Sequence, residues 1–398
     1  MKISNKVAGI QLSAHRKVIA IAQRKRAEGK TVYNFSQGQP SLPPDQSALQ
    51  AFCDRLLREP FETSRYSETR GLLDLRQAIC ADLKRYGGVD LVPDRVLLTD
   101  GAVEGLELSL STLLEAGDSV AIFDPCYTVY WDLLRFLDLK AVPIAQRLDG
   151  GFQPDLEDIK RAAAQASAIV LCSPDNPTSR IISEKAAGAI ADEVRDRNIP
   201  LLYDEAYKHI LFEGEHVWMQ KFSGIEDKLI CLDSFSKELA IPGFRLGYCY
   251  GPREAIDQMA KVKAFTSICS PTPSQYLALE YLRRDIKEAY LKRALEVYRG
   301  RRDALYEAVK HMLPSAKVIK PVAGMYLFPD FRPYLDKAGL GDVEFCIRLA
   351  EEADVVAVPG SASGPHGEGH LRLCFIGEKE EKLRAGVQKM AEFLDPLL

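Results

Sequence analysis

A lysine with neighbouring hydroxyls and an arginine stands just after a short apolar run of this chain. The apolar residues 229–232 are typical of a buried strand, and Ser234, Ser236, Lys237 and Arg245 follow them. Ligands of α/β proteins bind at the carboxyl ends of strands. A lysine that is partly desolvated beside a cation has a lowered pKa, and its free amine can form a Schiff base with a carbonyl.

The hydroxyls and the guanidinium of this segment are suitable donors for a phosphate. Together with the lysine they predict a site for a phosphorylated aldehyde, pyridoxal 5′-phosphate (PLP). A second interpretation stays open for the segment alone, because short motifs give false positives. In that interpretation Lys237 caps a loop and Arg245 forms a surface ion pair.

Polar residues follow other apolar runs and could serve the same site. Asp204 ends the run 201–203, where a buried carboxylate could keep a pyridine nitrogen protonated. Asn176 and Tyr207 could donate to a ring oxygen, and Gly101 opens a helix whose free N–H groups could bind phosphate. Each residue also has an ordinary structural explanation, as a helix cap or a turn residue.

Two further side chains fit such a site. Tyr127 could stack on a flat ring, although aromatic residues of the hydrophobic core are commoner. Arg372 alternates with Leu371 and Leu373, so it either faces solvent or holds a carboxylate through two hydrogen bonds. The hypothesis of one site depends on the whole set, because its members follow successive predicted strands.

Short apolar runs alternate with helical stretches from residue 95 onward. The runs, which we expect to be strands, are 96–98, 120–123, 141–144, 169–172, 201–203, 229–232 and 246–250. The helical stretches between them include 103–114, 130–137, 156–166 and 184–197. This alternation predicts an α/β fold with a mostly parallel seven-stranded sheet between helices, and the site at one edge of it.

The flanking segments have a different pattern. We expect a helix from about residue 11 to 29, a strand at 32–35, helices at 48–58 and 72–86, and a long helical region at 274–311. Beyond it the pattern becomes α+β, with strands near 318–319, 325–328, 355–357 and 371–375 and a helix at 343–352. The sequence thus predicts a large cofactor-binding domain, 45–290, and a small domain formed by 1–44 and 291–398.

Composition narrows the class of protein. The 398 residues are 46% hydrophobic and 27% charged, with a formal net charge of −4, so neither a nucleic-acid nor a membrane partner is expected. No apolar run is long enough for a transmembrane helix, and no secretory signal is recognisable. The nine cysteines form no CxxC pair and are typical of free thiols, which predicts a cytoplasmic protein. No metal site is predicted.

Over nearly its whole length, from Gln11 to Cys374, the chain resembles the fold-type I PLP-dependent aminotransferases of class I/II, in their aspartate/aromatic branch. Several motifs carry the resemblance: Ser234, Ser236, Lys237 and Arg245; Asn176-Pro177-Thr178; Asp204 with Tyr207; Tyr66 with Gly71; Pro125-Cys126-Tyr127; Pro359-Gly360-Ser361; and Arg372.

The resemblance implies a role for each of these residues. Lys237 forms the internal aldimine and moves the proton between the substrate and the cofactor, while Asp204 pairs with the pyridine nitrogen. Arg372, Asn176 and the Gly38 backbone hold the substrate α-carboxylate. Tyr66 reaches the cofactor phosphate of the neighbouring subunit, so the implied unit is a homodimer. The implied cofactor-binding residues are Gly101, Ala102, Val103, Tyr127, Asn176, Asp204, Tyr207, Ser234, Ser236, Lys237 and Arg245.

The activity that we expect is amino-group transfer between an L-amino acid and a 2-keto acid, by a ping-pong mechanism, in amino acid metabolism or biosynthesis. An alternative stays open: the same fold and cofactor also serve β- or γ-elimination lyases, cyclases and oxidases, because the protein decides the fate of the carbanion. A regulatory PLP-binding domain is disfavoured, because no helix-turn-helix module is present.

Two departures from the family pattern stand out. Ser179 replaces the usual glycine after Asn-Pro-Thr, beside Arg180, so the loop there is expected to differ. Val103 stands where some dicarboxylate-specific relatives carry a lysine, which weakens a preference for aspartate or glutamate. The segment 15–17, a histidine followed by two basic residues, borders the pocket in relatives, but such charge clusters are more often a solvated helix face.

Overall fold

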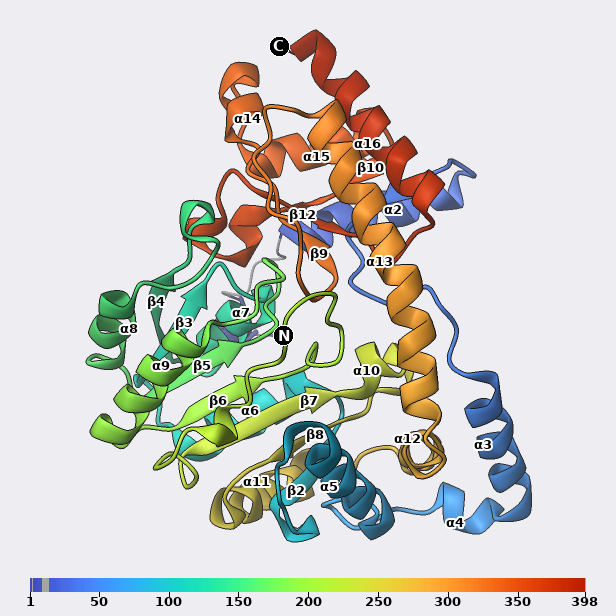
Figure 1. Ribbon diagram of the computed structural model, residues 1–398, viewed down its shortest axis with the longest axis vertical. Helices are drawn as coiled ribbons and strands as arrows, with labels where there is room; N and C mark the ends of the chain where they lie inside the picture. Colours follow the sequence, from blue (N-terminus) through green and yellow to red (C-terminus); the bar gives the residue numbers. More distant parts are fainter. Residues whose placement is uncertain (2, 9–13, 398) are drawn as a thin grey trace.

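The computed structural model describes residues 1, 3–8 and 14–397, and its central feature is a seven-stranded sheet (Figure 1). The strand order is β2-β8-β7-β6-β5-β3-β4, and only β8 runs antiparallel to its neighbours. The strands are β2 (Val96–Thr99), β3 (Ser119–Asp124), β4 (Lys140–Ala145), β5 (Ala168–Cys172), β6 (Leu201–Asp204), β7 (Leu229–Ser234) and β8 (Gly247–Tyr250). Every one of the seven runs predicted from the sequence is a strand, so the predicted α/β fold class is confirmed.

Some of the helices between these strands begin where a side chain caps them. Helix α9 (Glu184–Arg197) is an example: the Ser183 side chain accepts from the Ala186 N–H, and the helix ends at Asn198 in the left-handed conformation. Ile190 and Val194 lie on its buried face at helical spacing. The other helices of this part are α6 (Ala102–Leu113), α7 (Thr128–Phe136), α8 (Leu156–Ala163), α10 (Phe235–Glu238) and α11 (Arg253–Thr266).

Parallel pairing brings the polar ends of the central strands to one edge of the sheet. Cys172 of β5 lies opposite Asp204 of β6, and Asp204 lies opposite Leu232 of β7. Because the chain turns polar just after each of these positions, residues far apart in sequence meet at this edge. This is the arrangement that the sequence predicts for the functional site.

The long helical region predicted at 274–311 is two helices, so that prediction is wrong in detail. Helix α12 (Thr272–Arg283) ends, and α13 (Ile286–Met312) begins after Asp285, whose φ of 54° is incompatible with a continuous helix. Figure 1 shows α13 running from beside the large sheet to the segments near the C-terminus. The remaining helices are α1 (Asn5–Ala8), α2 (Ala14–Ala27), α3 (Gln46–Arg58), α4 (Pro60–Ser64), α5 (Leu73–Gly87), α14 (Arg332–Ala338), α15 (Asp342–Glu352) and α16 (Glu380–Leu394).

Two small sheets join the N-terminal and C-terminal segments. Strand β1 (Tyr33–Asn34) pairs in parallel with β10 (Val355–Val356). A second sheet has the antiparallel order β11 (Val358–Pro359), β12 (Leu371–Cys374) and β9 (Tyr326–Leu327). The division into domains 45–290 and 1–44 with 291–398 remains a prediction.

The flanking segments differ from the sequence predictions at residues 318–319. The strand expected at 318–319 is wrong: Ile319 is 44% exposed, and only an isolated bridge between Lys317 and Asp330 forms there. The expected start of the first helix, at residue 11, lies outside the described residues. Among the described residues, no helix combines the length and the apolar character needed to cross a membrane.

Candidate active site

A cavity of about 190 Å³ lies at the carboxyl edge of the sheet. It brings together every predicted site residue except one: Gly38, Gly101, Ala102, Val103, Tyr127, Asn176, Asp204, Tyr207, Ser234, Ser236, Lys237, Arg245 and Arg372. The exception is Tyr66, whose side chain is 77% exposed and lies outside the cavity of its own chain. Residues from both ends of the chain and from the large sheet thus form one site.

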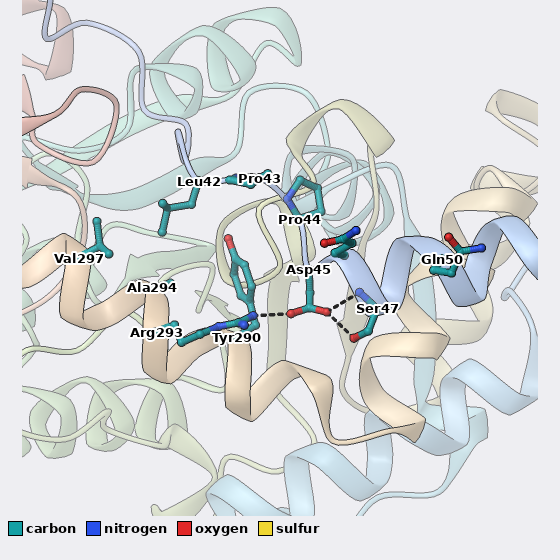
Figure 2. A pocket seen from close by; sticks show the side chains of 11 residues that line it. Leu42, Pro43, Pro44, Asp45, Ser47, Gln50, Tyr290, Arg293, Ala294 and Val297 are labelled. Atoms are coloured by element: carbon teal, nitrogen blue, oxygen red, sulfur yellow. Dashed lines mark hydrogen bonds and ion pairs between the residues drawn. The ribbon is translucent and has the colours of Figure 1, made fainter.

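A larger and more open cavity, of about 710 Å³, lies between the start of α3 and helix α13 (Figure 2). Its charged groups are already paired, because the Asp45 carboxylate accepts from both Arg293 and Ser47. Leu42, Val297 and other apolar side chains form most of the remaining wall. It contains none of the predicted site residues, so the smaller cavity is the better candidate for chemistry.

Lys237 enters the cavity from the short helix α10, directly after strand β7. The Ser234 side chain caps this helix by accepting from the Ser236 N–H at 3.3 Å, which fixes where the lysine points. Lys237 Nζ donates to the carbonyl of Gly38 at 2.6 Å. Burial lowers the pKa of Lys237 to about 8, with a further contribution from the positive charge of Arg372. An amine with this pKa loses its proton close to neutral pH and is a competent base and nucleophile.

The Asp204 carboxylate is buried at the end of strand β6, with 7% exposure. Its Oδ2 accepts from the Tyr130 hydroxyl at 2.6 Å, and its Oδ1 accepts from the Ala206 N–H at 3.1 Å. Burial raises the pKa of Asp204 to about 6, because the charged form loses hydration. Such a carboxylate gains a favourable interaction when a protonated ring nitrogen binds next to it.

Donors for an anion gather where strand β2 leads into helix α6. Gly101, with φ of 93°, precedes the first turn of the helix, whose N–H groups are open to a ligand. A Cβ at Gly101 would lie 2.8 Å from Arg245 Nη2, so glycine allows the guanidinium to approach the backbone. The Ser236 hydroxyl is buried and has no partner among the described residues. This donor set fits a phosphate.

Arg372 lines the same cavity, with 3% exposure. Its Nη2 donates to the Ser36 carbonyl at 2.9 Å and its Nη1 to Asn176 Oδ1 at 3.3 Å. The guanidinium carbon lies 4.6 Å from the centre of the Tyr326 ring. Arg372 therefore faces the cavity rather than solvent, in an orientation suited to holding a carboxylate.

Asn176 and Tyr207 meet within the same cavity. Asn176 Nδ2 donates to the Tyr207 hydroxyl at 3.5 Å, and this hydroxyl is 3.3 Å from that of Tyr326. Both of the predicted donors for a ring oxygen are thus side by side, and the Tyr207 hydroxyl also contacts Tyr326, a tyrosine that the sequence did not indicate.

His15 differs from the expectation of a solvated helix face. It lines the cavity, and its Nε2 lies 3.3 Å from the Ser36 carbonyl that Arg372 also uses. Burial and the charge of Arg372 lower the pKa of His15 to about 3, so the ring is neutral. Arg16 and Lys17 are exposed, as expected for that face.

Tyr326 and Tyr130 are cavity residues that sequence reasoning missed. Tyr326 reaches the site because strand β9 pairs with β12, with Tyr326 opposite Cys374, two residues after Arg372. Only that pairing, which is not visible in the sequence, places the tyrosine beside the arginine. Tyr130 stands inside an apolar helix, where an aromatic residue gives no signal distinct from that of a core residue.

Comparison with known proteins agrees with this geometry. The family model described as aminotransferase class I and II matches residues 30–390. A probable aspartate/prephenate aminotransferase of Aquifex aeolicus is 30% identical over 99% of this chain and 99% of its own length. The aspartate aminotransferase of Pyrococcus horikoshii is 31% identical over 89% of this chain and 88% of its own.

Solved structures show the same likeness. The aspartate aminotransferase of Thermus thermophilus with maleate superposes with a TM-score of 0.91 at 28% identity, over 98% of this chain and 99% of that one. Small amino acids and keto acids are the substrates of this class of enzyme. The chain therefore belongs to the class I and II aminotransferase family and is a transaminase.

Proposed function

We propose that the cavity at the carboxyl edge of the sheet binds PLP and transfers an amino group between an L-amino acid and a 2-keto acid in two half-reactions. The observation that carries the proposal is that Lys237, Asp204 and Arg372 line one cavity. These residues supply an amine, a buried carboxylate for a ring nitrogen, and a cation for a substrate carboxylate. The family assignment supports the cofactor.

The described residues fit PLP in three places, of which the first is Lys237, whose amine fits the carbonyl. The anion donors beside helix α6, with the unpartnered hydroxyl of Ser236, fit the phosphate. Asp204 fits the ring nitrogen. The residues that we propose to hold the ring and the phosphate are Gly101, Ala102, Val103, Tyr127, Asn176, Asp204, Tyr207, Ser234, Ser236 and Arg245. When bound, PLP supplies a carbonyl that takes up an amine and a ring that withdraws electrons from the substrate Cα–H bond.

The protein groups then have distinct tasks. Lys237 Nζ, with its lowered pKa, accepts the Cα proton as a free amine and donates a proton later as an ammonium group. Asp204, as a carboxylate, keeps a proton on the ring nitrogen. Arg372 binds the α-carboxylate and thereby orients the substrate. Tyr127, Tyr130, Tyr207 and Tyr326 line the cavity and reduce the space that is left for water beside a bound ligand.

We also propose a homodimer in which Tyr66 contributes to the site of the neighbouring subunit. The 77% exposure of Tyr66, beside the exposed Phe61, supports a covered position in an assembly. The segment that carries Tyr66 is tied to helix α12, because the Thr272 hydroxyl donates to the Arg65 carbonyl at 2.8 Å. A solution mass equal to a single chain, measured by light scattering, would contradict this proposal.

We also propose the division into two domains and the cytoplasmic location that the sequence predicts. Residues 45–290 would form the cofactor-binding domain, and 1–44 with 291–398 the small domain. A cytoplasmic location is supported by the nine cysteines, which are all free thiols, as in a reducing compartment. Cooperative unfolding of a fragment 45–290 by itself would support the division into domains. The cell fraction that contains the native protein would test the location.

The experiment that tests the function is an absorbance spectrum of the protein with PLP, followed by single amino acids. L-aspartate, L-glutamate and the aromatic amino acids come first, because relatives carry aspartate/prephenate and aromatic names. We expect a visible band of the bound cofactor to give way to a near-ultraviolet band as keto acid is released. A band that persists while ammonia accumulates would indicate a lyase or an oxidase, and no band at all would overturn the cofactor assignment.

Replacing Arg372 with alanine is expected to raise KM for the responding amino acid about 10- to 100-fold, with a smaller effect on kcat. The reason is the loss of charge-assisted hydrogen bonds to the substrate carboxylate. Steady-state kinetics of R372A, with the exposed Arg161→Ala as the matched control, measures this. An unchanged KM in R372A would remove Arg372 from carboxylate binding.

A further inference from the structure

Ser179 closes the loop that carries Asn176, in a backbone conformation that side chains rarely adopt. Its φ is 57°, in the left-handed region that favours glycine, and the residue is 1% exposed. Its N–H donates to the Asp175 carbonyl at 3.0 Å, so the turn itself needs no side chain. A strained serine kept where glycine suffices points to a task for the hydroxyl.

The Ser179 hydroxyl reaches strand β9 of the smaller sheet. Its Oγ accepts a hydrogen bond from the Tyr326 N–H at 3.1 Å. Gly324 makes room for this contact, because a Cβ at Gly324 would lie 2.8 Å from Ser179 Oγ. Residues 179 and 324 are therefore matched in size. A glycine at position 179 could not form the bond, because it has no side chain.

Tyr326 connects this bond to the carboxylate-binding wall of the cavity. Its ring lies under the Arg372 guanidinium, and its hydroxyl is 3.3 Å from that of Tyr207. A Cβ at Gly38 would lie 2.0 Å from the Tyr326 hydroxyl, so the Tyr326 ring has little freedom to move toward Gly38. The backbone of Tyr326 then decides where the ring lies. The pairing of β9 with β12 places this backbone, and the Ser179 hydroxyl fixes it further by accepting from its N–H.

The loop 175–180 thus reaches Arg372 by two routes. Asn176 Oδ1 accepts directly from Arg372 Nη1 at 3.3 Å. Ser179 acts indirectly, through the backbone and then the ring of Tyr326. Together they orient the guanidinium in its plane and support one of its faces.

We propose that Ser179 is a positioning residue for substrate binding: its hydroxyl fixes Tyr326, whose ring holds Arg372 in the orientation that a substrate carboxylate needs. The proposal rests on the proposed function of the cavity. It concerns the hydroxyl and not the turn, so two substitutions at one position can separate the two contributions.

Ser179→Ala removes the hydroxyl and keeps the strained backbone, whereas Ser179→Gly removes both the hydroxyl and the strain. We expect both variants to raise KM for the responding amino acid about 3- to 10-fold, as for one lost hydrogen bond. The kcat and the dissociation constant for PLP are expected to change less than about twofold. Crystal structures of the variants are expected to show the Tyr326 ring displaced from Arg372, beyond the present 4.6 Å. If the alanine variant does not fold, the unstrained glycine variant carries the test.

Ser183→Ala is the matched control. Its hydroxyl also accepts from a backbone N–H, that of Ala186 at 3.2 Å, but it does so at the start of helix α9, away from the cavity. We expect S183A to keep the wild-type KM. An equal rise of KM in S183A, or a wild-type KM in both Ser179 variants, would overturn the role of Ser179 alone. A wild-type protein that responds to no amino acid would instead overturn the proposed function and this role with it.

Discussion

Lys237→Ala is expected to keep the fold and lose about 10³- to 10⁴-fold of the transamination rate, because the only amine that we assign to proton transfer is removed. The fold is expected to survive, since among the described residues the lysine donates a hydrogen bond only to the Gly38 carbonyl, and the cap of helix α10 comes from Ser234. Single-turnover kinetics with the responding amino acid measures the loss of rate.

The same variant also tests where PLP is attached. Borohydride reduction of the PLP-loaded wild-type protein, followed by peptide mass mapping, is expected to find the cofactor on the peptide that contains Lys237. K237A is expected to carry none. The exposed Lys160→Ala serves as the matched control and is expected to behave as wild type. Wild-type turnover in K237A, or a labelled peptide elsewhere, would overturn the assignment of the lysine.

Asp204→Asn is expected to lower kcat about 10²- to 10³-fold, because a buried protonated ring nitrogen would lose its charged partner. The amide keeps the size of the side chain, its oxygen can still accept from the Ala206 N–H, and its NH2 group can donate to the Tyr130 hydroxyl oxygen, so the cavity is expected to stay intact. Steady-state kinetics measures the effect, with the exposed Asp192→Asn as the control. A kcat within about twofold of wild type would remove Asp204 from this role.

Asp204→Asn is also expected to change how the free energy of unfolding of the cofactor-free protein depends on pH. Burial raises the pKa of Asp204 from 3.8 to about 6 in the folded state, so between these values the folded protein binds more protons than the unfolded chain. The stability that this group contributes is fully present below pH 3.8 and is lost as the pH rises through about 6. Over that range the wild-type free energy of unfolding is expected to fall by about 3 kcal/mol relative to the variant.

Urea unfolding of both cofactor-free proteins at pH 4, 5, 6 and 7, at one protein concentration, measures this difference. Ionisable groups that do not interact with Asp204 affect both proteins alike and cancel in the comparison. Parallel pH dependences would show that Asp204 is not held in the desolvated environment that the structure gives it.

The sequence predicted the strands of the large sheet because their signal is local. Runs such as 169–172 and 201–203 are continuously apolar, as strands buried on both faces must be. The same reasoning failed at 318–319, where two apolar residues stand alone and remain partly exposed. It also missed the break at Asp285, because an aspartate in the left-handed conformation leaves no periodicity signal.

Sequence motifs by themselves determined which residue types carry the chemistry. Asn176 and Lys237 stand a few residues past the ends of β5 and β7, and Asp204 is the last residue of β6, so parallel pairing had to bring them to one edge. Arg245 stands just before β8, which runs antiparallel and therefore begins at the same edge. Arg372 was ambiguous in the sequence, since alternation allows either face of a strand. In the structure the Arg372 side chain is buried and donates to Ser36 and Asn176, so it faces the cavity and not the solvent.

Only the tertiary structure decided what surrounds these residues. His15 enters the cavity from the N-terminal segment, and Tyr326 lies beside Arg372 because strand β9 pairs with strand β12. The hydrogen bond from the Tyr326 N–H to Ser179 Oγ supports a positioning role for this serine, which in the sequence is only a departure from the family pattern. Such contacts depend on strand register and on the packing of distant segments, whereas residue type and local apolar spacing can be read directly from the sequence.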